Sequence, residues 1–447
     1  MRHLHFGRRI MNFSELFKQS NQLCRFSPNG NHVANCSSYR LIVRDAKTLQ
    51  ITSLFTCIDA INHFEWSPDS MFVLCCLFKR AIVQVWSLEQ PDWRCKIDEG
   101  SSGLTAATWS PDSRHILATA DFNLRVTVWS LTDKSVFYMK YPKGIRSGLD
   151  FTRDGKFLAL AERRDCKDYV SVFACDSWQL YKHFPVETSD MSGIRWSPDG
   201  HFLCVWESLL EYGVYIYSID GRRVAYFSAY QYALGIKSIG WSPSSQFLAV
   251  GSYDQKIRLL NNITWKTIGE FTHVRKFEQN DDVVVYKEIE KKSTYEEQVT
   301  SKFRVKSQYE VCEGSLTVPT LKPDLDKAHP KVGVGIMAFS NDSQYLATRN
   351  DNMPNALWIW DVHKLRQSVL MLQTSSITAF SWDPLNPRLA ICTGKSKVYM
   401  WSPAGCITVD IPNDPLFHAQ SIDWNPSGDA LALVSKDQFT VCYLTDV

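Results

Sequence analysis

The chain has 447 residues, of which 45% are hydrophobic, and its net charge is only +2. That near-neutral balance argues against a nucleic-acid-binding protein, which usually presents a strongly basic face. The longest apolar run, Met71–Phe78, is far shorter than the roughly 20 residues of a membrane-spanning helix. Neither nucleic acid nor a membrane is therefore expected as a partner.

The basic N-terminus lacks an apolar segment of the kind that secretory signals carry. Residues 1–10 are expected to form a disordered extension, and residues 11–447 one folded region. The 13 cysteines are odd in number and form no Cys-x-x-Cys pair, and most lie in strand-like segments such as the one around Cys204. Buried free thiols in a reducing compartment are the main interpretation, and disulfides remain the alternative.

One unit recurs along the chain: a short apolar strand that ends in Trp or Phe, a turn, and a second apolar strand. The spacings between successive aromatic residues are 40, 43, 42, 45, 45, 98, 43 and 42. The nine aromatic positions are Phe26, Trp66, Trp109, Phe151, Trp196, Trp241, Phe339, Trp382 and Trp424.

The turns explain the pattern. In Trp66–Ser70 the proline presets the first turn position, and the aspartate and serine accommodate the reversal. A second strand such as Phe247–Val250 follows, then a third that ends in an aromatic, such as Val83–Trp86, and a weaker fourth, such as Thr52–Phe55. Four short strands in roughly 42 residues are typical of a WD-repeat β-propeller blade.

The last unit stops after its third strand, and the segment Asn12–Phe17 precedes the first unit without a blade of its own. This segment is expected to supply the missing strand of the last blade. The sequence thus predicts an all-β WD-repeat propeller, a single closed ring of about nine four-stranded blades. Two propellers or an open arrangement are the alternatives.

A charged insertion at about residues 274–330 interrupts the repeat. It holds ten Lys or Arg and eleven Asp or Glu, and two strand-like runs, Val283–Ile289 and Phe303–Val311. These runs predict a protruding hairpin, followed by an extended stretch with three prolines. The insertion is interpreted either as a tolerated surface loop or as a partner-binding arm.

Three long connections between second and third strands are expected on the same face of the propeller as the insertion. They are Glu162–Asp168, Glu207–Glu211 and Arg349–Asn355. Loops on a rigid scaffold commonly carry binding. The hypothesised partner-binding residues are Arg163, Arg164, Asp165, Lys167, Asp168, Glu207, Glu211, Arg349, Asp351 and Asn352.

Motifs for catalysis are missing from the sequence. Gly394–Ser396 resembles the end of a phosphate-binding loop, but position 389 is Leu389 rather than the required glycine. Gly333–Gly335 precedes a blade strand instead of opening a helix. No metal-binding His/Cys cluster or nucleophile elbow occurs. The protein is therefore expected to be no enzyme and to use no cofactor or metal.

Several strings closely resemble one family, the centrosomal and spindle-pole WD-repeat proteins encoded antisense to the p-seventy-three gene, also called the Wdr-eight family. The resemblance covers nearly the whole chain from Met11 and is weak only in the middle of the insertion. The resembling strings are Met11–Glu15, Val83–Ile97, Leu160–Val172, Gly235–Asp254, Ala347–Ala356 and Pro387–Gly394.

This resemblance implies a non-catalytic scaffold of the cytoplasm and cytoskeleton, at centrosomes, centriolar satellites or spindle poles. It implies a coiled-coil anchoring partner of the SSX-two-interacting or Msd-one type and, in fungal members, a minus-end-directed kinesin. Anchoring of microtubule minus ends, spindle assembly and cilium formation would follow.

Two other functions stay open. Substrate receptors of ubiquitin ligases often carry Trp-Asp-x-Arg at the end of a third strand, and Trp360–His363 here ends in His instead of Arg. Translation-related propellers include nine-bladed rings, but this sequence has no appended RNA-binding segment.

Overall fold

The computed structural model describes residues 9–144, 147–277, 283–292, 305–312, 314–324, 326–412 and 416–446. Within them the strands form nine blade sheets and one small two-stranded ladder. This confirms the nine-bladed propeller arrangement predicted from the spacing of the aromatic residues. The chain divides into two compact units, Ser27–Ile236 and Met1–Phe26 with Lys237–Val447, and each is described by itself.

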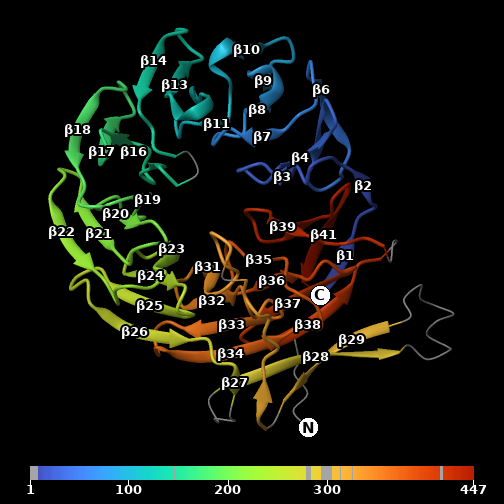
Figure 1. The fold of residues 1–447 in the computed structure, drawn as a ribbon. Helices are drawn as coiled ribbons and strands as arrows, with labels where there is room; N and C mark the ends of the chain where they lie inside the picture. Colours follow the sequence, from blue (N-terminus) through green and yellow to red (C-terminus); the bar gives the residue numbers. More distant parts are fainter. Residues whose placement is uncertain are drawn as a thin grey trace. The chain divides into compact units, whose positions relative to one another are not determined.

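Each blade is an antiparallel meander, and its strands are called a to d in chain order. Figure 1 shows those of Ser27–Ile236 in blue to green. Strand β3 (Cys24–Phe26) opens the first blade, followed by β4 (His32–Ser37), β5 (Arg40–Asp45) and β6 (Ile51–Thr56). The next two blades are β7 (His63–Trp66), β8 (Phe72–Leu77), β9 (Ile82–Ser87), β10 (Arg94–Asp98), and β11 (Ala106–Trp109), β12 (His115–Thr119), β13 (Arg125–Ser130), β14 (Val136–Lys140). The last two are β15 (Leu149–Phe151), β16 (Phe157–Arg164), β17 (Lys167–Ala174), β18 (Leu180–Pro185), and β19 (Met191–Trp196), β20 (Phe202–Glu207), β21 (Val214–Ser218), β22 (Arg223–Phe227).

The other unit holds the remaining blades. They begin with β23 (Ile236–Trp241), β24 (Phe247–Ser252), β25 (Lys256–Asn261), β26 (Thr267–Thr272), and continue with β31 (Val334–Phe339), β32 (Tyr345–Asn350), β33 (Ala356–Asp361), β34 (Arg366–Leu372). They end with β35 (Ala379–Trp382), β36 (Leu389–Cys392), β37 (Lys397–Ser402), β38 (Gly405–Asp410), and β39 (Ser421–Trp424), β40 (Ala430–Val434), β41 (Gln438–Asp446).

The last blade takes its outer strand from the start of the chain, as the sequence predicted. Strand β1 (Arg9–Phe13) pairs antiparallel with β41, and the short β2 (Phe17–Lys18) pairs with the same strand. Strand β1 begins two residues before the expected boundary at Met11. Residues 1–8 lie outside the described residues, so their disorder stays a prediction.

The middle strands form the core. Every residue of β9 and of β33 is buried, whereas the outer strands β6 and β18 are mostly exposed. This explains why the second and third strands read as continuous apolar runs: both of their faces are covered.

At three of the tryptophans that end strand a, the indole ties the blade to the preceding one. The indole Nε1 of Trp109 donates to the backbone oxygen of Glu65 over 3.2 Å. Trp382 donates to Ala338 over 2.9 Å, and Trp424 to Ser381 over 3.1 Å. A buried indole N–H needs an acceptor, and the preceding strand a supplies it.

The turn after each aromatic residue is closed by side chains. The Ser67 hydroxyl donates to Asp69 and accepts from the Phe72 amide. The fourth turn residue, Ser70, has φ of 64°, a left-handed value at which other blades use glycine. Serine is tolerated there because its hydroxyl accepts from the Asn29 amide of the neighbouring blade.

Candidate partner-binding connections

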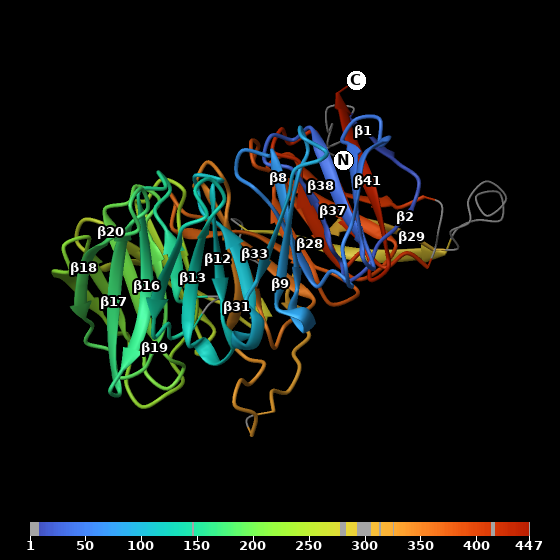
Figure 2. The ribbon, with the colours of Figure 1, turned by 90° about the horizontal axis from the view of Figure 1, so that it is seen from above.

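The first expected connection, Glu162–Asp168, is not a long loop. Strands β16 and β17 extend through most of it and pair along eight residues (Figure 2), so only Asp165 and Cys166 form the turn. The strands continue because Arg163 of this hairpin forms an ion pair with Asp190 of the next connection. The predicted loop is therefore corrected to the tip of a long hairpin.

Asp168 lies at the base of this tip and is 2% exposed. Lys143 Nζ donates to both of its oxygens at 2.9 Å, and Arg163 Nη1 donates at 3.0 Å. The Thr188 hydroxyl and the Met191 amide donate to the second oxygen. A carboxylate with this many charge-assisted bonds is structural, so Asp168 is not available to a partner.

Asp190 is half exposed and faces the same two cations, at 2.8 Å from Lys143 and 3.1 Å from Arg163. The hydrogen bond from Lys143 lowers the pKa of Asp190. Two carboxylates thus enclose two cations, and the cluster neutralises itself. The cluster thereby joins the β16–β17 hairpin to the connection between β18 and β19.

Glu207 has a similar role. It is 2% exposed, ends β20 rather than starting a loop, and accepts from the amides of Ser189 and Asp190 at 2.9 and 3.1 Å. Burial raises its pKa. The exposed Glu211 accepts only the Ser189 hydroxyl, at 3.2 Å. The prediction that Glu207 binds a partner is therefore corrected, because this residue holds the connection between β18 and β19 in place. Glu211 is exposed, and binding by its side chain remains a prediction.

The exposed predicted residues of this unit are found at the hairpin tip. The side chains of Arg164 and Asp165 are 66% and 89% exposed, and Lys167 is exposed beside them. The Arg164 guanidinium lies 5.7 Å from the centre of the Tyr141 ring. Binding by these side chains remains a prediction.

In the other unit, Arg349, Asp351 and Asn352 also lie together. Asp351 accepts from Lys237 at 2.7 Å and from Arg349 at 3.1 Å, and Arg349 donates to the Ile377 oxygen at 2.6 Å. Asn352 is buried, with its amide 3.3 Å from the Gln255 side chain. Asn352 is thus a support inside the connection, which corrects its expected place on a binding face.

Sequence reasoning missed the buried His273. Its Nδ1 lies 2.8 Å from the Gln255 carbonyl, and its Nε2 lies 2.9 Å from the Thr348 hydroxyl, which accepts from Trp360 Nε1 at 2.8 Å. The carbonyl can only accept, so Nδ1 carries the proton and the threonine donates to Nε2. Burial lowers the pKa of His273 to about 4. The Trp360-Asp361 pair at the end of β33 was the sequence feature that could have indicated this hydrogen-bonded cluster.

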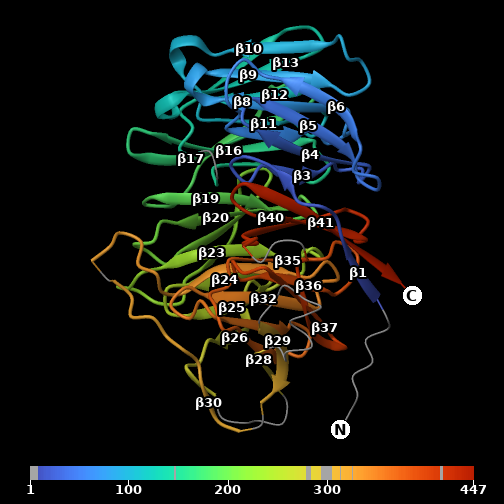
Figure 3. The same cartoon turned by 90° about the vertical axis from the view of Figure 1, so that its right-hand side faces the viewer.

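The insertion forms the predicted hairpin, but the hairpin is built into the fold. Strands β28 (Val284–Lys292) and β29 (Val305–Val311) pair antiparallel, and β28 pairs parallel with β34 (Figure 1), which makes a six-stranded sheet. The small ladder pairs β27 (Lys276–Phe277), which precedes this hairpin in the chain, with β30 (Leu316–Thr317), which comes after it. Figure 3 shows the chain, in orange, running away from the sheets after β30.

Side chains fix the hairpin to the next blade as well. Buried Glu288 accepts from the Tyr399 hydroxyl at 2.7 Å and from the Thr374 amide at 2.8 Å. The Tyr309 ring lies 6.0 Å from that of Tyr399, and Lys397 donates to Ser307. The base of the insertion is therefore core structure and not a free arm. Asp281 and Asp282 of the insertion lie outside the described residues.

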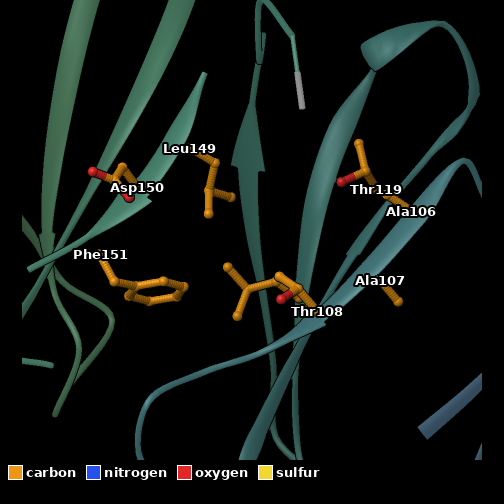
Figure 4. Close-up of a pocket in the computed structure, with 8 residues that line it drawn as sticks. Ala106, Ala107, Thr108, Thr119, Leu149, Asp150 and Phe151 are labelled. Carbon is orange, nitrogen blue, oxygen red and sulfur yellow. The ribbon is translucent and has the colours of Figure 1, made fainter. Parts of the chain in front are cut away.

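A pocket of about 300 Å³ lies beside β11, β12 and β15 (Figure 4). Leu149, Phe151 and Thr108 line it together with Asp150, the one ionisable side chain in the lining. Asp150 accepts from the Trp196 amide at 2.6 Å, and burial raises its pKa. A single carboxylate already bonded to the backbone offers no nucleophile and base pair.

Metal-binding and membrane-spanning features were also sought. Among the described residues, no three His, Cys, Asp or Glu side chains gather as a metal ion would require. The described helices are all too short to cross a bilayer. Nine of the described cysteines are buried and are not joined in disulfides, whereas Cys166 at the hairpin tip is exposed.

Comparison with known proteins decides the family. The chain is 55% identical over 444 residues to mouse "WD repeat-containing protein WRAP73", covering 97% of this chain and 96% of the mouse protein. This chain belongs to the WRAP73 family of WD-repeat proteins. An uncharacterized WD repeat-containing protein of Schizosaccharomyces pombe, C32H8.09, is 25% identical over 98% of this chain and 93% of its own.

Partial matches accompany the WRAP73 relationship. Residues 221–261 match the WD domain, G-beta repeat, and residues 85–233 match the family of eukaryotic translation initiation factor eIF2A. The crystal structure of the C-terminal WD40 domain of Sif2 aligns with a TM-score of 0.53 and 11% identity, covering 97% of this chain and 98% of that one. At this identity the likeness establishes the fold alone.

Proposed function

We propose that this protein is a non-catalytic scaffold at centrosomes, centriolar satellites and spindle poles, where it anchors microtubule minus ends together with a coiled-coil partner. The observation that carries the proposal is the 55% identity to WRAP73 along nearly the whole chain. The resembling strings, which extend beyond what a generic blade requires, support the proposed cellular role. Spindle assembly and cilium formation would depend on this scaffold.

The mechanism is display of fixed side chains. Connections such as the β16–β17 tip are braced by buried carboxylates, for example Asp168 with its two cationic partners. Braced connections lose little conformational entropy when a partner binds, and this favours affinity. A coiled-coil anchoring protein of the SSX-two-interacting or Msd-one type is the proposed partner, and in fungal members a minus-end-directed kinesin joins it.

A second function is favoured by one specific observation, the match of residues 85–233 to the eIF2A family. That match covers only part of the chain and lies within the longer WRAP73 alignment, so a role in translation ranks second. The ubiquitin-ligase function has no such support. Trp360 and Asp361 of its candidate motif are buried, and Asp361 accepts from the Lys364 amide at 2.9 Å.

Purification of the tagged full chain from dividing cells separates these functions. The scaffold proposal predicts co-purification of the coiled-coil anchor, and a fluorescent fusion concentrated at centrosomes and spindle poles. Ribosomal subunits recovered in its place, with diffuse cytoplasmic fluorescence, would instead support the translation function. Recovery of ubiquitin-ligase adaptors would instead support a role as a substrate receptor of a ubiquitin ligase.

A further inference from the structure

Exposed apolar side chains in Ser27–Ile236 are distributed unequally. Some lie on outer strands, namely Ile51, Leu54, Tyr138, Leu180, Tyr181, Val224 and Tyr226. The others lie in connections, and we call them the loop-tip patch: Tyr39, Ile58, Phe122, Leu124, Tyr141, Leu210 and Tyr232.

All members of the loop-tip patch occur in connections between strands b and c or between strand d and the next strand a. The described a–b and c–d turns of the same unit contain no exposed large apolar side chain. In an antiparallel meander the b–c and d–a connections lie at one end of the strands. Single exposed apolar residues are ordinary, but their restriction to one end indicates a binding surface.

Hydrogen bonds and an ion pair join most of these connections into one belt. Asn123 donates to the Lys143 oxygen, which places Phe122 and Leu124 beside the connection that holds Tyr141. The Tyr141 oxygen accepts from the Arg163 amide at 3.2 Å.

Beyond the hairpin the belt continues. Arg163 contacts Asp190, and the Asp190 oxygen accepts from the Ser208 amide at 2.8 Å. The Leu209 oxygen accepts from the Gly235 amide at 2.8 Å, so Leu210 and Tyr232 lie on adjoining connections. The patch thus follows successive blades.

Backbone conformation gives a second, independent observation. Phe122, Tyr141 and Tyr232 have φ of 56°, 61° and 61°, in the left-handed region that bulky residues seldom adopt. Trp178 also has a positive φ, but its side chain is buried and packs in the core. Phe122 and Tyr232 are 92% and 101% exposed and gain no such packing. Strain without a folding benefit is found at functional positions.

We propose that the loop-tip patch docks the apolar stripe of an amphipathic α-helix in a coiled-coil partner, an inference that rests on the proposed scaffold function. The connections are turns whose amides bond locally, as Ala81 does to Phe78 and Leu124 does to Asp121. The described parts of these connections offer no strand edge to an extended peptide, so recognition falls to side chains and favours a helix.

The charges around the patch suit such a helix. Exposed Arg164 and Lys167 lie close to exposed Asp165, and Glu211 lies near Leu210. Both signs therefore border the apolar side chains, as they border the apolar stripe of a coiled-coil helix. Aromatic residues such as Phe122 and Tyr232 are the types that dominate binding energy at interfaces.

The test is the affinity of the full chain for the purified coiled-coil anchoring protein, measured by biolayer interferometry. The double variant Phe122→Ser with Tyr232→Ser is expected to weaken binding at least tenfold. The control changes two half-exposed aromatic residues on outer strands, Tyr138→Ser with Tyr181→Ser, and is expected to bind like the wild type. Thermal unfolding verifies that both variants fold.

A photoreactive amino acid at position 122 provides the second readout. Cross-links to the coiled-coil segment of the partner support the helix, and cross-links confined to other parts of it overturn that assignment. Equal affinity of the two double variants would overturn the inference and leave the scaffold function standing. No binding by the wild type would overturn both.

Discussion

Replacing Asp168 by asparagine tests the assignment of this residue as a buried brace. The carboxylate accepts from Lys143, Arg163, Thr188 and Met191, and it is almost completely buried. Asparagine keeps the shape but loses the charge, and its amide group turns a donor toward other donors. Leaving these partly buried cations with one carboxylate fewer costs about 3 kcal/mol, at the low end for a broken buried pair because Asp190 remains and Arg163 is partly exposed.

The expected result is a lower melting temperature. At about 2.1 cal/mol/K of unfolding entropy per residue, each kcal/mol shifts the Tm of a 447-residue chain by roughly 1 °C, so the variant should melt about 3 °C lower. Circular dichroism or calorimetry measures this shift. The control is Asp190→Asn, which faces the same cations from a half-exposed position and should cost less than about 1 kcal/mol. Equal shifts in the two variants, or none in the first, would refute the reasoning.

Three further predictions concern single sites. Burial holds the pKa of His273 at about 4, below its usual 6.5, so the unfolded chain takes up the proton first as the pH falls. The contribution of His273 to the free energy of unfolding is therefore complete above pH 6.5 and falls by on the order of 3 kcal/mol toward pH 4. His273→Gln should flatten this pH dependence, as measured by urea unfolding. Glu288→Ala should loosen the insertion, so that trypsin cuts between β28 and β29 at least tenfold faster, and an unchanged rate would show that the hairpin is held otherwise. Arg164→Glu should slow association with the anchoring protein severalfold, whereas Lys134→Glu on a c–d turn should not, and equal effects would contradict a role for the hairpin tip.

The blades could be predicted because their chemistry is local and repeats. Each unit has an aromatic residue at the end of its first strand, and in the units at Phe151 and Phe339 a Thr or Ser hydroxyl still bonds an aspartate two residues on, so both units could be found even where proline is missing. The incomplete last unit also indicated that the first strand would join it, and β1 does so.

The parts that escaped prediction depend on distant partners. Parallel pairing of β28 with β34 joins residues 85 apart in the sequence, such as Val284 and Val369, and no local pattern specifies that register. Asp168 and Glu207 are charged, so they were placed in exposed loops. Only the fold shows the cations and amides that bury them.

The exposed side of the candidate site was anticipated only in part. The b–c and d–a connections were expected to carry binding, but the charged residues were singled out and the apolar Phe122 and Tyr232 were not. An apolar residue in a sequence is read as core by default. Its exposure becomes visible only when the turn that holds it has been placed.

Co-elution of the purified full chain with the purified coiled-coil anchoring protein, by size-exclusion chromatography with light scattering, tests the central claim most directly. The scaffold account predicts one earlier peak whose mass equals the sum of defined numbers of the two chains, and which persists when the mixture is diluted to micromolar concentration. Two separate peaks at the masses of the isolated proteins would contradict the account, while the nine-bladed WRAP73-family fold would stand.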